Sequence, residues 1–184
     1  QRLFEIADER RVFVLFAVES GSRAWGFESK DSDWDVRWIY LSPRSHYLRV
    51  FPVRDVIEQS DLGRADPILD FAGWDVQKAL GLITKSNPSI FEWLQSPFVY
   101  EEQDCWRNTR AAFLSIYSPR ASAHHYLSMA KHNYREHMRG GDAARVRLKK
   151  YLYITRPLLC LRWIAAHPNS GPPPMRIGEL FAAN

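Results

Sequence analysis

The sequence predicts an α+β protein, in which a half built from strands and short helices is followed by an all-helical half. Up to about residue 100, short apolar runs with strand character alternate with clusters of Gly, Pro, Ser and Asp. From about residue 105 the apolar residues instead recur with helical period. A chain of 184 residues can form one solid core, or a core with a helical appendage. We therefore expect a first domain over 1–104 and a helical domain over 105–184.

The first half is predicted to begin with a helix over 2–10 and a strand over 11–18. The run RVFVLFAV at 11–18 is continuously apolar and rich in Val and Phe, which is typical of a strand buried on both faces. The later elements, in chain order, are a helical turn near 22, a strand over 33–42 closed by Pro43, a helix or turn over 44–51, a strand over 53–60, a turn over 62–67, a strand over 68–71 ended by Gly73, a helix over 74–86, and a short helix that starts at Pro88.

The second half is predicted to contain three helices, over 105–117, 119–138 and 143–166. The stretch RGGD at 139–142 separates the last two as a turn, and Pro157 is expected to kink or end the third helix. HPNSGPPP at 167–174 is predicted to be a proline-rich linker. The final residues, IGELFAAN, have the pattern of a helix opening, so we expect further chain at the C-terminal end.

The overall composition restricts the class of protein without identifying it. A net charge of +4 and a pI near 9.2 are compatible with an anionic partner but do not require one. The sequence shows no transmembrane span and no signal peptide, so we expect no membrane partner. Cys105 and Cys160 have no metal or disulfide motif around them, and we interpret them as two buried thiols in a reducing cytoplasm.

Three aspartates carry the strongest chemical signal. Asp33 and Asp35 are two residues apart at the start of a predicted strand, so their carboxylates should point to the same face. Two such charges repel each other unless a cation lies between them, and carboxylate oxygens suit Mg²⁺ or Mn²⁺. Asp70 can join them if its strand lies alongside, and three carboxylates could then hold two divalent ions that bridge a nucleoside triphosphate.

This hypothesis has alternatives and a condition. An isolated Asp-x-Asp is commonly a solvated turn or a helix cap, and the conjunction with Asp70 is what favours a metal site. The hypothesis requires the carboxylates of Asp33, Asp35 and Asp70 to converge on one spot. Burial of Asp33 or Asp35 in an ion pair with arginine would contradict it.

A phosphate site is predicted just upstream of these acids. Gly21 and Ser22 follow a buried strand and precede a helical turn, where free backbone N–H groups and a hydroxyl can bind phosphate oxygens. Arg23 could reach a phosphate, or it could be a solvated arginine. Ser32 could orient a neighbouring carboxylate, or it could simply end a turn.

The pattern of Gly-Ser, a spacer, an acid–apolar–acid strand and a later strand acid resembles the nucleotidyltransferase superfamily of DNA polymerase β. The segments that carry the resemblance are GSRAWGF and SDWDVRWIY, with LDFAGWDVQKALGLITKSNPSIFEWLQSP and KKYLYITRPLLCLRW. Taken together they are most similar to the RNA-ligase-associated (RlaP-type) predicted nucleotidyltransferases, over roughly 12–165. Ser20 departs from the superfamily, which usually has an apolar residue before the glycine.

The resemblance implies a nucleotidyltransferase fold, with a small mixed sheet and flanking helices, followed by a helical domain. It implies that Asp33 and Asp35 bind both metal ions, and that Asp70 binds the catalytic ion and helps to deprotonate an acceptor hydroxyl. Gly21 and Ser22 would hold the outer phosphates. The reaction would join a nucleoside monophosphate from an NTP to the acceptor and release pyrophosphate.

The acceptor remains open at this point. Family analogy and the mildly basic balance favour an RNA end, in RNA repair or processing. The alternatives are transfer to a small molecule such as an aminoglycoside, transfer to a protein side chain, and a non-catalytic nucleotide- or RNA-binding module. The sequence does not indicate which nucleotide is used or what the oligomeric state is.

Four further residues are candidates for substrate contacts. Lys85 lies where the helix over 74–86 ends, where it could interact with the helix dipole or contact a triphosphate. Lys149, Tyr153 and Arg156 share one helical stripe. A base stacked on Tyr153 with cations beside it would suit a nucleotide or an RNA strand, whereas the alternative is the wet face of an amphipathic helix.

Overall fold

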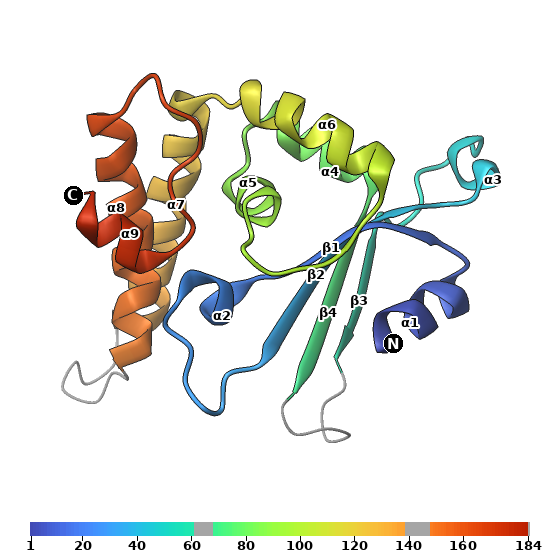
Figure 1. The fold of residues 1–184 in the computed structure, drawn as a ribbon, viewed down its shortest axis with the longest axis horizontal. Coiled ribbons are helices and arrows are strands. Elements are labelled where there is room, and N and C mark those ends of the chain that lie inside the picture. The colour runs from blue at the N-terminus through green and yellow to red at the C-terminus, as the bar shows by residue number, and fades with distance from the viewer. Residues whose placement is uncertain (61–67, 139–147, 184) are drawn as a thin grey trace.

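The computed structural model describes residues 1–60, 68–138 and 148–183, which form a mixed sheet with helices on both faces and a helical layer at one end (Figure 1). The turns expected at 62–67 and 139–142 both lie outside the described residues. The strands are β1 (Phe13–Glu19), β2 (Trp34–Leu41), β3 (Val56–Ser60), β4 (Leu69–Asp75) and β5 (Val99–Glu102). The helices are α1 (Arg2–Arg10), α2 (Gly21–Trp25), α3 (Arg44–Tyr47), α4 (Val76–Thr84), α5 (Pro88–Leu94), α6 (Asp104–Ser115), α7 (Pro119–Met138), α8 (Leu148–Ala166) and α9 (Ile177–Ala182).

The sheet has the strand order β3-β4-β2-β1-β5. β2 and β4 run parallel, whereas the pairs β1–β2, β1–β5 and β3–β4 are antiparallel, so the sheet is mixed as expected. In the parallel pair Asp35 lies opposite Asp70. The backbone of the sheet alone therefore brings these two acids, 35 positions apart in the sequence, to adjacent strands.

The two faces of the sheet pack against different helices. On one face, Phe16 and Ile39 belong to a core shared with α4, α5 and α6. On the other face, Val36, Trp38 and Tyr40 pack with α1. This alternation along β2 is the period of two that a strand imposes, and Figure 1 shows α1 on the side of the sheet away from α4 and α6.

Gly73 lies within β4, so the expectation that it ends the strand is wrong. It pairs with Trp38, and a Cβ at position 73 would overlap the Trp38 indole. The glycine is therefore required by close packing across the two strands. The strand continues to Asp75, which is the N-cap of α4 and accepts a hydrogen bond from the backbone N–H of Gln77. The predicted helix over 74–86 consequently begins two residues later, at Val76.

Three further features differ from the sequence expectations. β5 was not anticipated, because four residues beside a helix start give little periodic signal. Pro157 lies inside α8, which continues to Ala166. The proline-rich segment packs against the protein: Pro173 is buried and its carbonyl accepts a hydrogen bond from Gln95, 3.5 Å away.

The helical layer has its own small core beside α2. Tyr126 of α7, Cys160 and Ile164 of α8 and Leu180 of α9 form this cluster. Cys160 is buried as expected, but Cys105 is exposed because it lies in the first turn of α6 on the side away from the sheet core. In the part of the chain that the structure describes, no helix has the length and apolar character needed to cross a membrane.

Candidate active site

Asp35 and Asp70 form the centre of the candidate site. They lie near the beginnings of the parallel strands β2 and β4, and register makes them direct neighbours on one face of the sheet. The side chain of Asp35 is 25 % exposed and that of Asp70 is 38 % exposed. Two acids from distant parts of the sequence thus meet at a partly open surface, as the sequence predicted for this pair.

Arg37 lies between the two carboxylates, and the sequence analysis did not identify it. Its Nη2 atom is 2.7 Å from Oδ1 of Asp35 and 2.8 Å from Oδ2 of Asp70, and its Nη1 donates to the backbone carbonyl of Asp70 at 3.0 Å. The available signal was the i, i+2 spacing of Asp35 and Arg37, which places them on the same face of β2. Both carboxylate oxygens therefore converge on one point, and a cation of the protein itself occupies it.

This ion pair bears directly on the condition set for a metal site. Asp35 does pair with arginine, but a quarter of its side chain remains exposed, so the pair does not seal the carboxylate away. Burial raises the pKa of Asp35 above its ordinary value, Arg37 opposes that shift, and the neighbouring charges of Asp70 and Asp33 reinforce it. Burial and the neighbouring acids thus make the charge on Asp35 less favourable than in water, in spite of Arg37.

Asp33 does not share the strand geometry of Asp35. β2 starts at Trp34, so Asp33 lies in the preceding loop and is exposed. Arg23 accounts for this path, because its guanidinium donates to the carbonyls of Ser32 at 2.8 Å and Asp33 at 3.1 Å and lies over the Trp34 ring. Asp33 thus precedes β2 by one residue, and its charge, like that of Asp35, raises the pKa of Tyr153 and also acts on the pKa of Asp35, so the predicted grouping of Asp33 with Asp35 stays a prediction.

Gly21 brings the start of α2 against Asp35. Its φ is +60°, a value that residues with a side chain rarely adopt, and a Cβ at this position would overlap Oδ2 of Asp35. The N–H of Ser20 donates to the Asp35 carbonyl at 2.9 Å. The predicted closeness of the Gly-Ser segment to the acid strand is thus present, and only glycine fits at position 21.

Ser22 and Ser32 face each other inside the protein. Both are buried, and the Ser22 hydroxyl donates to Oγ of Ser32 at 3.2 Å. The same Ser32 oxygen accepts the N–H of Ser29 and the Nζ of Lys149, each at 2.8 Å. Ser32 therefore fixes the loop before β2 to both α2 and α8, and the Ser22 hydroxyl is directed to this contact.

α8 supplies one wall of the site. Tyr153 makes edge contacts with Trp25 and Phe27, with ring centroids 5.7 and 5.8 Å away. Together with the contact of Lys149 to Ser32, this shows that the stripe predicted on this helix faces the sheet domain and is not a solvated face. Arg156, the third member of the stripe, is 2 % exposed and serves a structural contact described below.

Two cavities flank the site. One, of about 320 Å³, lies between the start of β2, α2, α5 and the helical layer, and its lining includes Gly21, Asp35, Arg37, Trp93 and Tyr153. The other, of about 660 Å³, lies outside the loop at 27–31 and is lined by Phe27, Ser29, Asp31, Lys149, Lys150, Leu152 and Tyr153. Lys85 lines neither cavity; it is exposed at the C-cap of α4.

Glu19 supports the site from behind, and the sequence analysis missed it. This last residue of β1 is 1 % exposed, accepts the backbone N–H of Asp35 at 3.0 Å and receives the hydroxyl of Tyr100 at 2.5 Å. Burial raises its pKa, and the two hydrogen bonds oppose that shift. An acid at the end of an otherwise apolar strand was the signal that could have identified it.

Glu92 and Arg156 join α5 to α8 in the interior. Their side chains are 6 % and 2 % exposed, with Nη1 of Arg156 2.7 Å from Oε1 of Glu92. Trp25 and Tyr126 also donate to Glu92, at 3.0 and 3.2 Å, and Arg156 donates to the carbonyl of Met175. These contacts give Glu92 a structural role.

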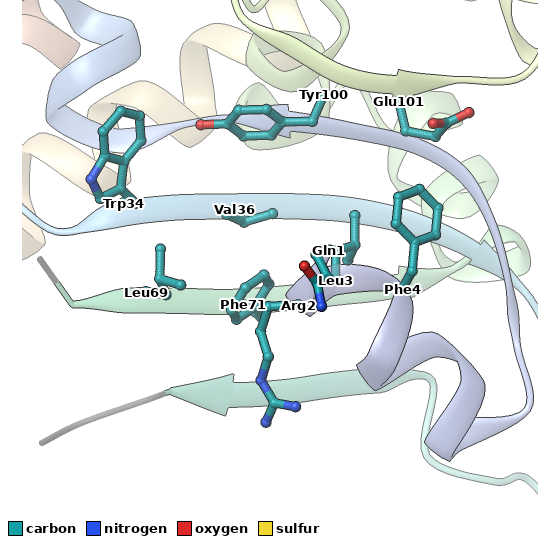
Figure 2. A pocket seen from close by; sticks show the side chains of 10 residues that line it. All are labelled: Gln1, Arg2, Leu3, Phe4, Trp34, Val36, Leu69, Phe71, Tyr100 and Glu101. Atoms are coloured by element: carbon teal, nitrogen blue, oxygen red, sulfur yellow. The ribbon is translucent and has the colours of Figure 1, made fainter. Parts of the chain in front are cut away.

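The sheet face opposite the acids carries an apolar cavity of about 400 Å³ beside α1. Figure 2 shows Trp34, Val36, Leu69 and Phe71 pointing to this side, with Tyr100 above them. The carboxylates of Asp35 and Asp70 alternate with these residues along β2 and β4, so they point to the other face. This cavity is therefore separate from the candidate site.

The donor set fits a divalent cation only in part. Among residues 1–60, 68–138 and 148–183, no three His, Cys, Asp or Glu side chains are arranged as they stand to hold a metal ion. Two carboxylate oxygens do already meet at a single positive nitrogen, which is the convergence that a hard cation needs. Asp35 and Asp70 therefore have suitable chemistry and placement once Arg37 has left the two oxygens that it contacts.

The fold and these acids together define a class of protein. A mixed sheet that aligns acids on neighbouring parallel strands beside a Gly-Ser turn, followed by a helical layer, is the arrangement implied by the resemblance to polymerase-β-like nucleotidyltransferases.

Comparison with known proteins agrees with this class. The family model described as the RNA repair pathway DNA polymerase beta family matches residues 1–184. An uncharacterized protein of Bacillus subtilis (strain 168), YcgL, is 42 % identical over 162 residues, which cover 88 % of this chain but 60 % of YcgL. No solved structure matches the chain. The chain therefore belongs to the RNA repair pathway DNA polymerase beta family, and it spans less than two thirds of its curated relative.

Proposed function

We propose that this protein is a Mg²⁺- or Mn²⁺-dependent nucleotidyltransferase that moves a nucleoside monophosphate from an NTP to a hydroxyl at an RNA end. The observation that carries the proposal is the convergence of Asp35 and Asp70 on a single cation, directly against the backbone at Gly21. Membership of a family named for RNA repair and for polymerase β supports both the reaction class and the acceptor.

The reaction requires one bond to form and one to break. The acceptor oxygen attacks the α-phosphorus of the NTP, the bond from that phosphorus to the bridging oxygen breaks, and pyrophosphate leaves with its electron pair. Asp70 is the acid placed to take up the hydroxyl proton, because its side chain is the more exposed of the pair. The segment at Gly21 and Ser22 would face the phosphates.

Asp35 and Asp70, with Asp33 from the adjacent loop, are the residues that would hold the divalent ions. Two ions bound there would neutralise charge on the transferred phosphate and favour the ionised acceptor oxygen. Glu19 contributes indirectly: it holds the Asp35 backbone by a hydrogen bond of 3.0 Å and so fixes the direction of the Asp35 side chain.

An RNA acceptor is supported by the larger cavity beside the site. It presents Lys149 and Lys150 together with the rings of Phe27 and Tyr153. Cations beside aromatic faces are the combination that binds single-stranded nucleic acid. In the described lining, Asp31 is the one acid, so this cavity is less suited to a polycationic acceptor such as an aminoglycoside.

Labelled transfer tests the proposed function. The protein is incubated with each α-³²P-labelled NTP, Mg²⁺ and an RNA oligonucleotide, and the RNA is resolved on a denaturing gel. We expect label on the RNA in the wild type and a loss of activity of more than about a hundredfold in Asp35→Asn. Removing a residue that only supports a metal ligand typically costs about 10- to 100-fold, and Asp35 is proposed as a ligand itself. Binding of the triphosphate without transfer to any acceptor would instead indicate a non-catalytic module.

Thermal melting distinguishes a lost site from a lost fold. Burial raises the pKa of Asp35, so its charged form is less favourable in the folded protein than in the unfolded chain, and Asp35→Asn should melt at or above the wild-type temperature. Asp8→Asn, on the exposed side of α1, is the matched control and should change neither activity nor melting. A large fall in the melting temperature of Asp35→Asn without metal would make Asp35 a structural residue.

A further inference from the structure

Arg37 occupies the point where the two central carboxylates meet. Its Nη2 contacts Asp35 at 2.7 Å and Asp70 at 2.8 Å, while Nη1 donates to the carbonyls of Asp70 at 3.0 Å and Val36 at 3.4 Å. The side chain is 19 % exposed, so it is held in the site and is still reachable from solvent. In this arrangement the guanidinium neutralises two like charges that would otherwise repel across the parallel pair.

A divalent ion cannot share these oxygens with Arg37. Mg²⁺ binds carboxylate oxygens at about 2.0–2.1 Å and requires a nearly complete shell of oxygen ligands. The guanidinium nitrogen already fills the space between the two oxygens, and a second cation at that distance would also be repelled strongly. Metal binding through Oδ1 of Asp35 and Oδ2 of Asp70, the two oxygens that face each other here, therefore requires the Arg37 side chain to move away.

The displaced side chain has a defined place to go. Arg37 lines the cavity of about 320 Å³ that also contains Gly21, Ser89 and Tyr153. Of the described residues that line this cavity, the acids are Asp35 and Glu92, and Glu92 is already paired with Arg156. An arginine released into this cavity would therefore lack an anionic partner until a phosphate arrives.

Two other cations near the site, Arg23 and Lys149, hold the loop before β2 in place. Arg23 binds the carbonyls of Ser32 and Asp33, and Lys149 binds the Ser32 hydroxyl. Moving either of them would release the loop before β2. Arg37 differs because its acidic partners are the residues that would bind metal.

We propose that Arg37 is an exchangeable counter-ion, which holds Asp35 and Asp70 in the metal-free enzyme and passes to the substrate phosphates when divalent ions take its place. This inference rests on the proposed function. It implies that metal and triphosphate bind cooperatively, because each ion that enters frees an arginine for the triphosphate and each triphosphate removes a competitor of the ion.

Binding of Mn²⁺, followed by the electron paramagnetic resonance signal of the free ion, tests this exchange without any turnover. In the wild type we expect weak Mn²⁺ binding alone, and tighter binding by about tenfold or more with a non-hydrolysable NTP. In Arg37→Met, Mn²⁺ alone should bind about tenfold more tightly than in the wild type, and the nucleotide should add little. Arg44→Met, an exposed arginine on α3, is the control and should behave as the wild type.

Melting in EDTA and in Mn²⁺ guards against a variant that merely fails to fold. Arg37→Met leaves two carboxylates facing each other, so it should melt at a lower temperature than the wild type in EDTA. Addition of Mn²⁺ should raise the melting temperature of the variant more than that of the wild type. Arg37→Gln serves as a second variant with the same expectation. Unchanged or weaker Mn²⁺ binding in both folded variants overturns the exchange.

The two proposals fail in different ways. If the wild type binds Mn²⁺ with the nucleotide, and Asp70→Asn abolishes that binding, the metal site stands whatever the Arg37 variants show. If neither the wild type nor the Arg37 variants bind Mn²⁺ with or without nucleotide, the metal-dependent function is overturned and the exchange with it.

Discussion

Glu19 is an acid held almost entirely out of water at the end of β1, and this makes stability depend on pH. Burial raises its pKa above the ordinary value of 4.5, so the folded protein retains this proton to a higher pH than the unfolded chain does. Stability contributed by this group is therefore full below the unfolded pKa and is lost as the pH rises from 4.5 through the raised pKa of the folded state.

Glu19→Gln tests this pH dependence, because glutamine keeps the shape and cannot ionise. The free energy of unfolding is measured in urea for the variant and the wild type. We expect the difference, variant minus wild type, to increase as the pH rises through this window and to level off above it. Glu28→Gln, an exposed glutamate, is the control and should show no such trend. If the wild type instead becomes more stable relative to the variant as the pH rises, the pKa of Glu19 is lowered in the folded protein.

At the scale of single residues, the sequence predicted acids better than it predicted their partners. Asp35 and Asp70 could be identified because acids inside strand patterns are uncommon. Arg37 was overlooked because an arginine in a strand is usually read as a solvent-facing residue, and only the register between β2 and β4 shows that it lies between two acids. The strand begins one residue later than predicted, at Trp34, where Arg23 holds the carbonyls of Ser32 and Asp33, a contact that no local pattern reveals.

At the scale of elements, a buried ion pair links α5 to α8 and so joins the two halves of the described chain. Glu92 and Arg156 are both almost fully buried, so removing one partner leaves an unpaired charge in the interior. We expect Arg156→Met to lower the free energy of unfolding in urea by about 3–5 kcal/mol. The double variant Glu92→Met/Arg156→Met should lose less than the sum of the two single changes.

An exposed pair in the same chain is a suitable comparison. Arg54 and Glu58, with side chains 71 % and 63 % exposed, form an ion pair at 2.6 Å. Such pairs contribute about 0–1 kcal/mol, so Arg54→Met should be nearly neutral. If Arg54→Met and Arg156→Met lower the free energy of unfolding equally, the buried pair does not stabilise the protein more than an exposed pair does.

Helix and strand positions were predictable wherever periodicity was long. The helix over 119–138 has the predicted bounds, and the strand over 11–18 is confirmed within two residues. The border between β4 and α4 was placed wrongly, because the close contact of Gly73 with Trp38 permits a strand where sequence alone suggests a break. Tertiary packing decided that border, and only the paired strand could have revealed it.

At the scale of the whole molecule, the core of the first sequence domain extends into the second through α6. Trp106 of α6 lies 5.9 Å from Phe16 of β1 in stacked geometry, and α6 packs with α4 and α5 over the sheet. Lys149 and Arg156 of α8 bind residues of the first domain. The boundary expected near residue 104 thus divides the sequence more clearly than it divides the packing.

We therefore expect the chain to unfold in urea in a single transition, with the same midpoint by tryptophan fluorescence and by far-ultraviolet circular dichroism. A fragment of residues 1–104 should unfold at lower urea and less cooperatively, because it lacks Trp106 and leaves Glu92 without its arginine. Two well-separated transitions in the whole chain, one of them matching the fragment, would contradict this expectation.

The parallel alignment of β2 with β4 also decides when the site can exist. Neighbouring parallel strands cannot be joined by a tight hairpin, and here α3 and β3 lie between β2 and β4 in the chain. The two acids therefore meet only when this long connection has brought β4 alongside β2. A nascent or partly unfolded chain consequently lacks the paired arrangement of Asp35 and Asp70. An ion that binds this pair would bind the native state alone, so the free energy of unfolding would rise with the ion concentration.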